Sequence, residues 1–338
     1  MATTRAHRVG DATVIKILEL ALEGTEAGVL YPDQANVSTA VEETRELWPG
    51  SVDPRTGLLR QSVHTWLVRT PTRVILVDTG AGNDKDRPNL PLVNHLNEPF
   101  LDRLKAAGVR PEDVNLVLHT HLHVDHVGWN TKKVDGRWVP TFPNARYLFS
   151  GRERAYLAAL STADGSDAAI RAEAKLGPMP HPPQRGVYEG VYEDSVLPVI
   201  DAGLAREIVV DGTEVEEDIS FLPIPGHSID HACIRFSSRG EQALFWGDVM
   251  HHPLQVVRPD FNSQFCEFPD AARESRRWAM NRAAETNALV FTTHFAESSV
   301  GRVSREGDRL AWHFATSARV HRWRDGRRSW RQLCVGLP

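Results

Sequence analysis

The sequence predicts an α/β fold in which several buried strands deliver metal-type side chains to one common edge. Two observations support this prediction. Short apolar runs alternate with segments of helical spacing, and several of these runs lead into histidine or aspartate. Because α/β folds place their chemistry at the carboxyl ends of strands, we expect these side chains to share one site. With 338 residues, the chain suits one large domain or two small ones. We expect a single domain over residues 1–338.

The expected elements follow from the periodicity of apolar residues along the chain. Strands are expected at residues 12–20, 62–69, 73–78, 114–118, 145–149, 207–210, 219–224, 231–236, 241–246 and 288–294. Helices are expected at residues 100–108, about 151–175 and 270–285. An N-terminal lead, about residues 1–60, is irregular after residue 22 and rich in Gly, Pro and acidic groups. It is expected to form a loop or short helices over part of a cleft.

A segment of about residues 151–200 stands out as an insertion. Its first half has helical spacing, and a Pro/Gly-rich stretch follows at residues 177–183. Such a stretch inside a compact domain usually serves as a functional lid or as an oligomer contact. We expect one of these two roles, and a homodimer is the oligomer that the second role would imply.

The densest cluster of metal-type side chains lies at residues 119–128, directly after one of the apolar runs. It contains the pattern H-x-H-x-D-H. His121 and His123 are two residues apart and project to the same side if the segment is extended, whereas Asp125 and His126 fall on the following turn. Imidazole nitrogen and carboxylate oxygen suit zinc and neighbouring divalent metals. One short segment could therefore supply two ligands to each of two adjacent metals.

Four further residues of this kind follow other expected strands. Asp78 stands in Val-Asp-Thr-Gly, His227 in Pro-Gly-His, Asp248 after Gly247, and His294 at the end of an apolar run. Each has a structural alternative, since Asp78 could be a turn aspartate that bonds its own backbone and a lone histidine is usually structural. Together they favour a shared site, in which Asp78 orients the ligands rather than binding metal.

Composition and charge indicate which kinds of binding partner the protein is expected to have. Hydrophobic content of 41% and charged content of 25% are ordinary globular values, and the net charge of −5 without a long basic block argues against nucleic acid. No apolar run reaches the length of a membrane span, and the N-terminus lacks the apolar core of a signal peptide. Three widely spaced cysteines, Cys233, Cys266 and Cys334, suggest reduced thiols. We therefore expect a cytoplasmic protein that acts on a small molecule.

These residues, in this order, resemble the motifs of the metallo-β-lactamase superfamily. The resemblance covers residues 74–294, about two thirds of the chain. It implies an αββα sandwich of two mixed β-sheets flanked by helices, and a dinuclear site. It assigns one metal to His121, His123 and His227, the other to Asp125, His126 and His294, and a bridging position to Asp248. Zinc is the expected metal, although manganese, iron or cobalt fit the same ligands.

The resemblance also implies a reaction. A hydroxide that bridges the two metals would attack an ester bond, with Asp125 and Asp248 balancing charge and Asp248, or a metal-bound water, returning a proton to the leaving oxygen. Trp129-Asn130-Thr131 and the Gly-Asp-x-x-His stretch look most like the branch of lactonases and methyl-parathion-hydrolase-like enzymes, so a lactone is the expected substrate. An organophosphate triesterase or arylesterase is the alternative, and a di-iron redox protein is a distant one.

One position departs from the best-known quorum-quenching lactonases. They carry a tyrosine three residues after the bridging aspartate to polarise the substrate carbonyl, and this chain has His251 there. Imidazole can also donate a hydrogen bond, so His251 is expected to take part in catalysis; the alternative is a plain loop or helix-cap residue. Trp129, His251 and Phe295 are expected to line the substrate pocket, with core packing as the alternative for the two aromatic residues.

Overall fold

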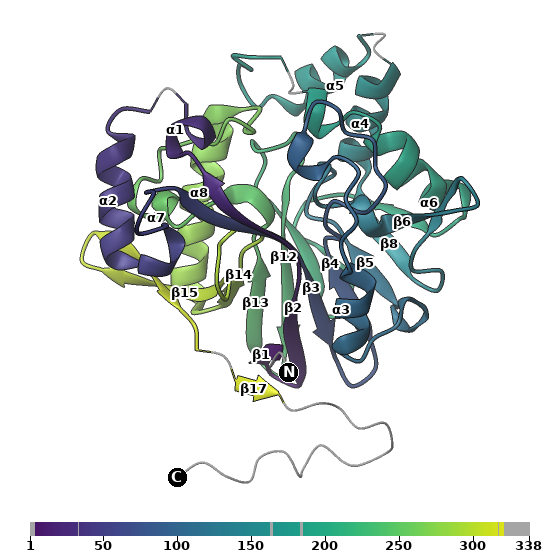
Figure 1. The fold of residues 1–338 in the computed structure, drawn as a ribbon, viewed down its shortest axis with the longest axis horizontal. Helices are drawn as coiled ribbons and strands as arrows, with labels where there is room; N and C mark the ends of the chain where they lie inside the picture. The colour runs from purple at the N-terminus through teal and green to yellow at the C-terminus, as the bar shows by residue number, and fades with distance from the viewer. Residues whose placement is uncertain (1–3, 33, 163–164, 183–184, 317, 321–338) are drawn as a thin grey trace.

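Two β-sheets stacked face to face make up the centre of the molecule, and helices cover both outer faces (Figure 1). The computed structural model describes residues 4–32, 34–162, 165–182, 185–316 and 318–320. Cys334 and four residues of the expected insertion, 163–164 and 183–184, lie outside this range. The predicted αββα sandwich of two mixed sheets is confirmed.

The first sheet has eight strands among the described residues and is antiparallel up to β4, then parallel. In order across the sheet, its strands are β17 (Ala318–Val320), β1 (Thr4–Val9), β2 (Ala12–Thr25), β3 (Leu59–Arg69), β4 (Val74–Val77), β5 (Leu116–Leu118), β8 (Arg146–Ser150) and β9 (Ala205–Ile208). Strands β3 and β4 form an antiparallel hairpin. Strand β2 is longer than expected and extends into the N-terminal lead.

The second sheet has seven strands in the described part of the chain, and only its β13–β14 pair is parallel. Its strands are β10 (Glu214–Glu216), β11 (Ile219–Pro223), β12 (Ala232–Ser238), β13 (Glu241–Phe245), β14 (Leu289–Phe291), β15 (Val300–Glu306) and β16 (Arg309–Phe314). A separate hairpin joins β6 (Thr131–Val134) and β7 (Arg137–Pro140). The sequence-based prediction missed β1, β6, β7, β10 and every described strand after residue 294.

The α-helices are α1 (Ala27–Leu30), α2 (Val37–Leu47), α3 (Phe100–Ala106), α4 (Gly151–Thr162), α5 (Asp167–Ala174), α6 (Leu197–Asp201), α7 (Leu254–Val257) and α8 (Pro269–Thr286). Short 3-10 turns lie at Pro49–Ser51, Pro91–Val93, Pro111–Asp113, Gly128–Asn130, Arg185–Val187 and Gly247–Val249, and a π-helical turn lies at Tyr192–Val196. The expected helix at about 151–175 is two helices, and the N-terminal lead forms α1 and α2. None of the described helices is long and apolar enough to cross a membrane.

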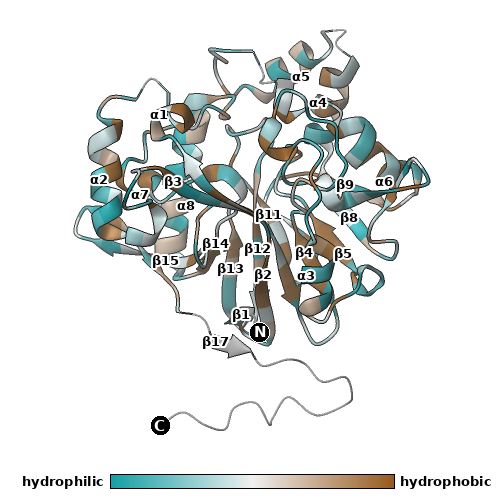
Figure 2. Cartoon of the chain, in the orientation of Figure 1, coloured by the Kyte–Doolittle hydropathy of each residue, from teal (hydrophilic) through white to brown (hydrophobic). Residues whose placement is uncertain are grey.

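Alternation along the strands explains the layers. In β4, Ile75 and Val77 point into a core shared with Phe221 and Phe245 of the second sheet, whereas Leu76 points the other way, into a core that contains Phe100 of α3. The far face of the second sheet packs on α8. Figure 2 shows the result, with brown hydrophobic strands in the middle and teal hydrophilic positions on the outer helices.

The strand directions show which strand ends lie at the same edge of each sheet. Strands β4 and β5 run parallel, so they end on the same side of the first sheet. In the second sheet, β11 and β13 are both antiparallel to β12, and β14 is parallel to β13, so these three strands also share a direction. The segments that carry the predicted site residues therefore leave each sheet at one edge.

Candidate metal centre

The loop after β5 is held in place by Asp78, which follows β4. The Asp78 carboxylate accepts hydrogen bonds from the Thr120 backbone N–H at 2.9 Å, from the Thr120 hydroxyl at 2.8 Å and from Nδ1 of His126 at 3.0 Å. Burial acts to raise the pKa of Asp78, but the neighbouring His126 and His119 lower it to about 2. Asp78 is therefore an anionic anchor beneath the histidine loop.

The same hydrogen bonds decide which ring nitrogens face inward. In the neutral, metal-binding form of His126, Nδ1 carries the proton and donates to Asp78, so Nε2 carries the free lone pair. Burial acts to lower the pKa of His126, but Asp248, Asp125 and Asp78 raise it well above its ordinary value, so a cation at Nε2 would displace a proton. The Thr120 hydroxyl donates its proton to Asp78, so its oxygen accepts a hydrogen bond from Nδ1 of His121, 3.1 Å away. The lone pair of the His121 ring is therefore on Nε2. One carboxylate thus sets the tautomer of two predicted ligands.

A glycine contact shapes the end of this loop. The Gly128 backbone N–H donates to the Gly80 carbonyl at 2.7 Å, and a Cβ at Gly128 would lie only 1.9 Å from the carbonyl of Ala81. Only glycine lets the loop pass this close to the turn after β4. The turn itself is fixed by Glu19 of β2, which accepts hydrogen bonds from the backbone of Ala81 and Gly82.

The predicted ligands of the first metal converge. Ligand atoms of His121, His123 and His227 all lie within 4.8 Å of one another, and all three residues are buried. Nδ1 of His123 lies 3.0 Å from Nε2 of His227. Burial, with further effects from neighbouring charges, lowers the pKa of each ring well below its ordinary value. The rings are therefore neutral near pH 7, which is the state that binds metal.

The predicted ligands of the second metal converge as well. Ligand atoms of Asp125, His126 and His294 lie within 4.8 Å of one another. The carboxylate of Asp125 lies 3.6 Å from Nε2 of His126 and 3.5 Å from Nε2 of His294. Nδ1 of His294 lies 3.0 Å from the Ser62 carbonyl, to which it donates, so its Nε2 faces inward.

Asp248 lies between the two groups. Its Oδ2 is 3.4 Å from Nε2 of His227, 3.3 Å from Nε2 of His126 and 3.0 Å from Nε2 of His294. Burial acts to raise the pKa of Asp248, but His126 and His294 hold it well below its ordinary value. This is the position that a carboxylate bridging two cations requires.

The donor set fits two divalent cations. Nε2 of His121, Nε2 of His126 and Oδ1 of Asp248 are buried and have no hydrogen-bond partner among the described residues. Buried polar atoms normally have partners, and cations held by these residues would supply them. Five imidazoles and two carboxylates without a thiolate match zinc and its neighbours.

Of the three expected pocket residues, the structure brings only His251 to the centre. Its Nε2 lies 3.4 Å from Oδ2 of Asp248, and its ring stacks on His294 at 5.4 Å. Trp129 is buried in the core, stacked on Phe100, and Phe295 is fully buried against Trp312. Trp129 and Phe295 therefore lie in the hydrophobic core, which was the alternative to a pocket-lining position.

Sequence reasoning missed several residues around the centre. His231 accepts a hydrogen bond from the Asp248 backbone N–H at 3.0 Å, and burial lowers its pKa to about 4, which keeps it a neutral acceptor. Tyr188 lies 2.9 Å from Nε2 of His123 and also contacts Glu267. The position of His231 directly before a strand was the one available signal, because Tyr188 and Glu267 belong to no motif.

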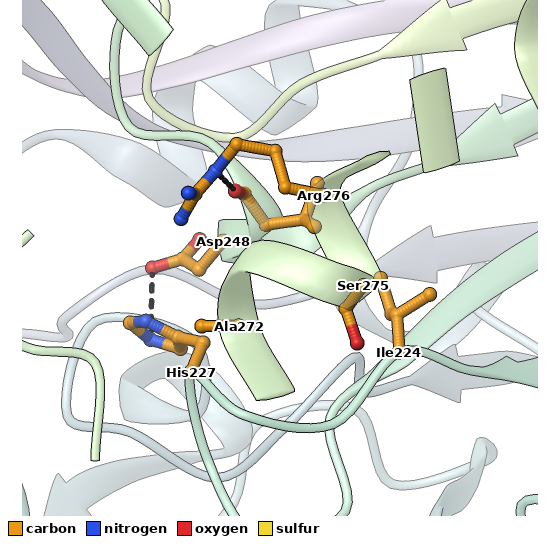
Figure 3. A pocket seen from close by; sticks show the side chains of 7 residues that line it. Ile224, His227, Asp248, Ala272, Ser275 and Arg276 are labelled. Atoms are coloured by element: carbon orange, nitrogen blue, oxygen red, sulfur yellow. Dashed lines mark hydrogen bonds and ion pairs between the residues drawn. The ribbon is translucent and has the colours of Figure 1, made fainter. Parts of the chain in front are cut away.

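A narrow crevice, too small to hold a water molecule, lies behind His227 and Asp248 on the side of α8. Figure 3 shows these two side chains pointing toward each other, with Ala272, Ser275 and Arg276 of α8 beside them. The Arg276 guanidinium donates to the Val249 carbonyl at 2.8 Å. Helix α8 thus closes one side of the centre. Asp125 is the one half-buried member of the predicted ligand set, so the open side lies at its carboxylate.

Comparison with known proteins agrees with this geometry. A profile of the metallo-beta-lactamase superfamily matches residues 59–294, and the chain belongs to that superfamily of metal-dependent hydrolases. The match spans the histidine loop and all three later ligand positions, as the sequence resemblance predicted.

Solved structures share the fold at low identity. The hydrolase AbOPH of the beta-lactamase superfamily is 23% identical with a TM-score of 0.74, over 94% of this chain and 98% of that one. AidC, a dizinc quorum-quenching lactonase in complex with its product, is 20% identical with a TM-score of 0.72, over 93% and 98%. A probable metal-dependent hydrolase from Staphylococcus aureus is 16% identical with a TM-score of 0.67, over 91% and 99%. At these identities the likeness concerns the fold.

Proposed function

We propose that the chain is a dinuclear metal-dependent hydrolase that opens an ester bond, with lactones as its substrate class. The observation that carries the proposal is the convergence of seven side chains from four loops, in two groups that share Asp248. Two bound divalent cations, with zinc as our first choice, would supply an activated water and polarise the scissile carbonyl. The lactonase AidC, which has this fold, supports the choice of substrate class.

The protein's own residues would divide the remaining work. Asp125 and Asp248 place two negative charges among five imidazoles, and the buried Asp248 could take up the proton of the attacking water and pass it to the leaving oxygen. His251 is neutral near pH 7 because burial lowers its pKa to about 3. Its Nδ1 has no partner among the described residues, so this ring has an atom available for the substrate.

Metal removal gives the first test. We expect protein treated with a chelator to lose ester hydrolysis and to unfold at a lower temperature, because ions that bind only the folded chain stabilise it by about 3–4 kcal/mol at 100 to 1,000 times Kd. The assay measures metal content, unfolding temperature and turnover of a panel of lactones, carboxylate esters and phosphotriesters on the same samples. Reloading with zinc should restore all three. Full turnover by metal-free protein would contradict the proposal.

Substitutions at His251, together with the substrate panel, test whether lactones are the substrate class. If its ring polarises the substrate carbonyl, His251→Phe should lower kcat for lactones about 100-fold with both metals retained. His251→Tyr, which restores a hydrogen-bond donor, should keep most of the activity. The alternative, an organophosphate triesterase or arylesterase, predicts that wild-type protein prefers phosphotriesters or aryl esters in the panel. Equal lactone turnover by His251→Phe and wild type would show that His251 has no role in the reaction.

A further inference from the structure

His123 differs from the other predicted histidine ligands in the ring atom that it presents. His121, His126 and His294 each direct Nε2 inward while Nδ1 bonds to protein. In His123 the arrangement is reversed, because Nδ1 lies 3.0 Å from Nε2 of His227 and Nε2 points away, toward Tyr188. Neither Asp78 nor the Ser62 carbonyl contacts His123, so a different group must set its tautomer.

Tyr188 and Glu267 together set the tautomer of His123. The Tyr188 hydroxyl oxygen lies 2.9 Å from Nε2 of His123, and the hydroxyl donates its proton to Oε1 of Glu267 in a short hydrogen bond. A hydroxyl has one proton, so the Tyr188 oxygen can then only accept from His123. The proton of the His123 ring is thereby placed on Nε2, and the lone pair is left on Nδ1.

Glu267 can serve as the terminal acceptor in either protonation state. Burial raises its pKa to about 8, and Oε2 has no hydrogen-bond partner among the described residues. A proton on Oε2 would still leave Oε1 free to accept from Tyr188. The direction of the chain holds for a carboxylate and for a carboxyl protonated on Oε2, whereas a proton on Oε1 would reverse it. The position of the proton on the His123 ring distinguishes these two arrangements.

The backbone holds the chain rigidly against both ligand loops. The Val124 N–H donates to the Val187 carbonyl at 3.1 Å, which fixes the segment of Tyr188 to the loop of His123. The Glu267 N–H donates to the His227 carbonyl at 3.2 Å, which fixes the other end to the second ligand loop. Tyr188 and Glu267 are 5% and 7% exposed, so water does not compete for these bonds.

We propose that Tyr188 and Glu267 are positioning residues that form a hydrogen-bond chain, His123 Nε2–H to Tyr188 to Glu267, and so present Nδ1 of His123 at the first metal position. This inference rests on the proposed metal centre. It assigns a role to the part of the insertion around Tyr188, which is packed against the histidine loop. It also predicts that the two metal positions respond differently when the chain is broken.

The test compares metal binding by four variants of the full-length protein. Tyr188→Phe removes the acceptor, and Glu267→Leu lets the tyrosine proton turn toward His123; each should weaken one of two zinc ions about 10–100-fold and leave the other within about threefold. Glu267→Gln keeps an oxygen acceptor and should bind like wild type. Tyr147→Phe is the matched control, since it removes a buried hydroxyl that bonds to Phe142 and Asn130 away from the centre.

Two readouts are needed. Competition with a chromophoric chelator gives the affinity and stoichiometry of zinc, and ¹⁵N NMR of the metal-free protein reports which nitrogen of His123 carries the proton. Unchanged affinity and tautomer in Tyr188→Phe, or a loss in Glu267→Gln equal to that in Glu267→Leu, would overturn the chain. If the wild-type protein itself binds no zinc, the proposed metal centre fails instead, and the NMR tautomer of His123 still tests the hydrogen-bond chain.

Discussion

The two halves of the candidate centre are built in different ways. The first half, His121 to His126, is one continuous loop whose ring orientations depend on a single carboxylate, Asp78. The second half consists of His227, Asp248 and His294, each on its own loop after β11, β13 and β14. Each of these loops has a separate contact: the Glu267 N–H with the His227 carbonyl, His231 with the Asp248 backbone, and the Ser62 carbonyl with His294.

The difference shows what local sequence can encode and what requires the whole fold. A continuous loop keeps its ligand spacing whenever β5 forms beside β4. Three separate loops meet only if every strand between them pairs in the correct register, because a slip of one residue would turn each side chain to the other face. Gly226 illustrates the precision required, since a Cβ there would lie 2.1 Å from the Ala272 nitrogen of α8.

The largest expected effect comes from Asp248, which belongs to both halves. Asp248→Asn removes the charge that faces His126, His227 and His294. We expect loss of both metals and a fall in ester hydrolysis well beyond the ~10–100-fold that groups behind the ligands contribute. Metal analysis after gel filtration, together with turnover at saturating zinc, checks this. A variant that retains two tightly bound ions would show that the halves do not share this carboxylate.

Substitutions behind the ligands should lower zinc affinity by a smaller factor, and by a different factor in each half. Asp78→Asn disturbs the tautomers of both His121 and His126, and we expect zinc affinity to fall about 10–100-fold. His231→Gln alters one contact to the Asp248 backbone, and we expect a fall of less than about tenfold, since a net hydrogen bond contributes ~1 kcal/mol. Chelator competition on both variants measures the ratio. Equal losses would contradict the idea that one carboxylate organises the first half.

The fold and the convergence of most candidate ligands could be predicted, because both depend on short sequence patterns. Apolar runs that end in histidine or aspartate placed Asp78, His227 and Asp248 at strand ends, and the structure has them there. The prediction failed where contacts are long-range. Trp129 follows the histidine motif, but its indole N–H bonds to Glu19, 110 residues away, and this contact holds it in the core.

The strands after residue 294 were missed for a different reason. In β15 the buried Val300, Gly301 and Val303 are interrupted by Arg302 and followed by polar positions, so the strand shows neither a continuous apolar run nor a regular alternation. Charged side chains are common on strands near a sheet edge, where they discourage pairing with other molecules. Tyr188 could not have been predicted at all, since its role depends on Val187 and Glu267 meeting the two ligand loops in space.

The smallest expected effect on the metal centre itself concerns the support that β2 gives to the second half. The Lys16 ammonium donates to the hydroxyls of Ser62 and Ser299 and to two carbonyls of the loop after His294. Burial lowers the pKa of Lys16 from 10.5 to about 7. Between these values the unfolded chain binds a proton that the folded chain does not, so stability rises with pH by up to ~1.4 kcal/mol per pH unit and is lost as pH falls toward 7.

Lys16→Met should remove this slope and lower stability by about 1–3 kcal/mol at high pH, because the surrounding oxygens lose their donor. Urea midpoints from pH 7 to 10 measure both quantities. Lys105→Met, at an exposed position on α3, is the control and should keep the wild-type slope. Because Ser62 bonds both Lys16 and His294, a change confined to stability would show that β2 holds the loop as a whole. A change in zinc affinity as well would show that the second half depends on this strand for the orientation of its last ligand.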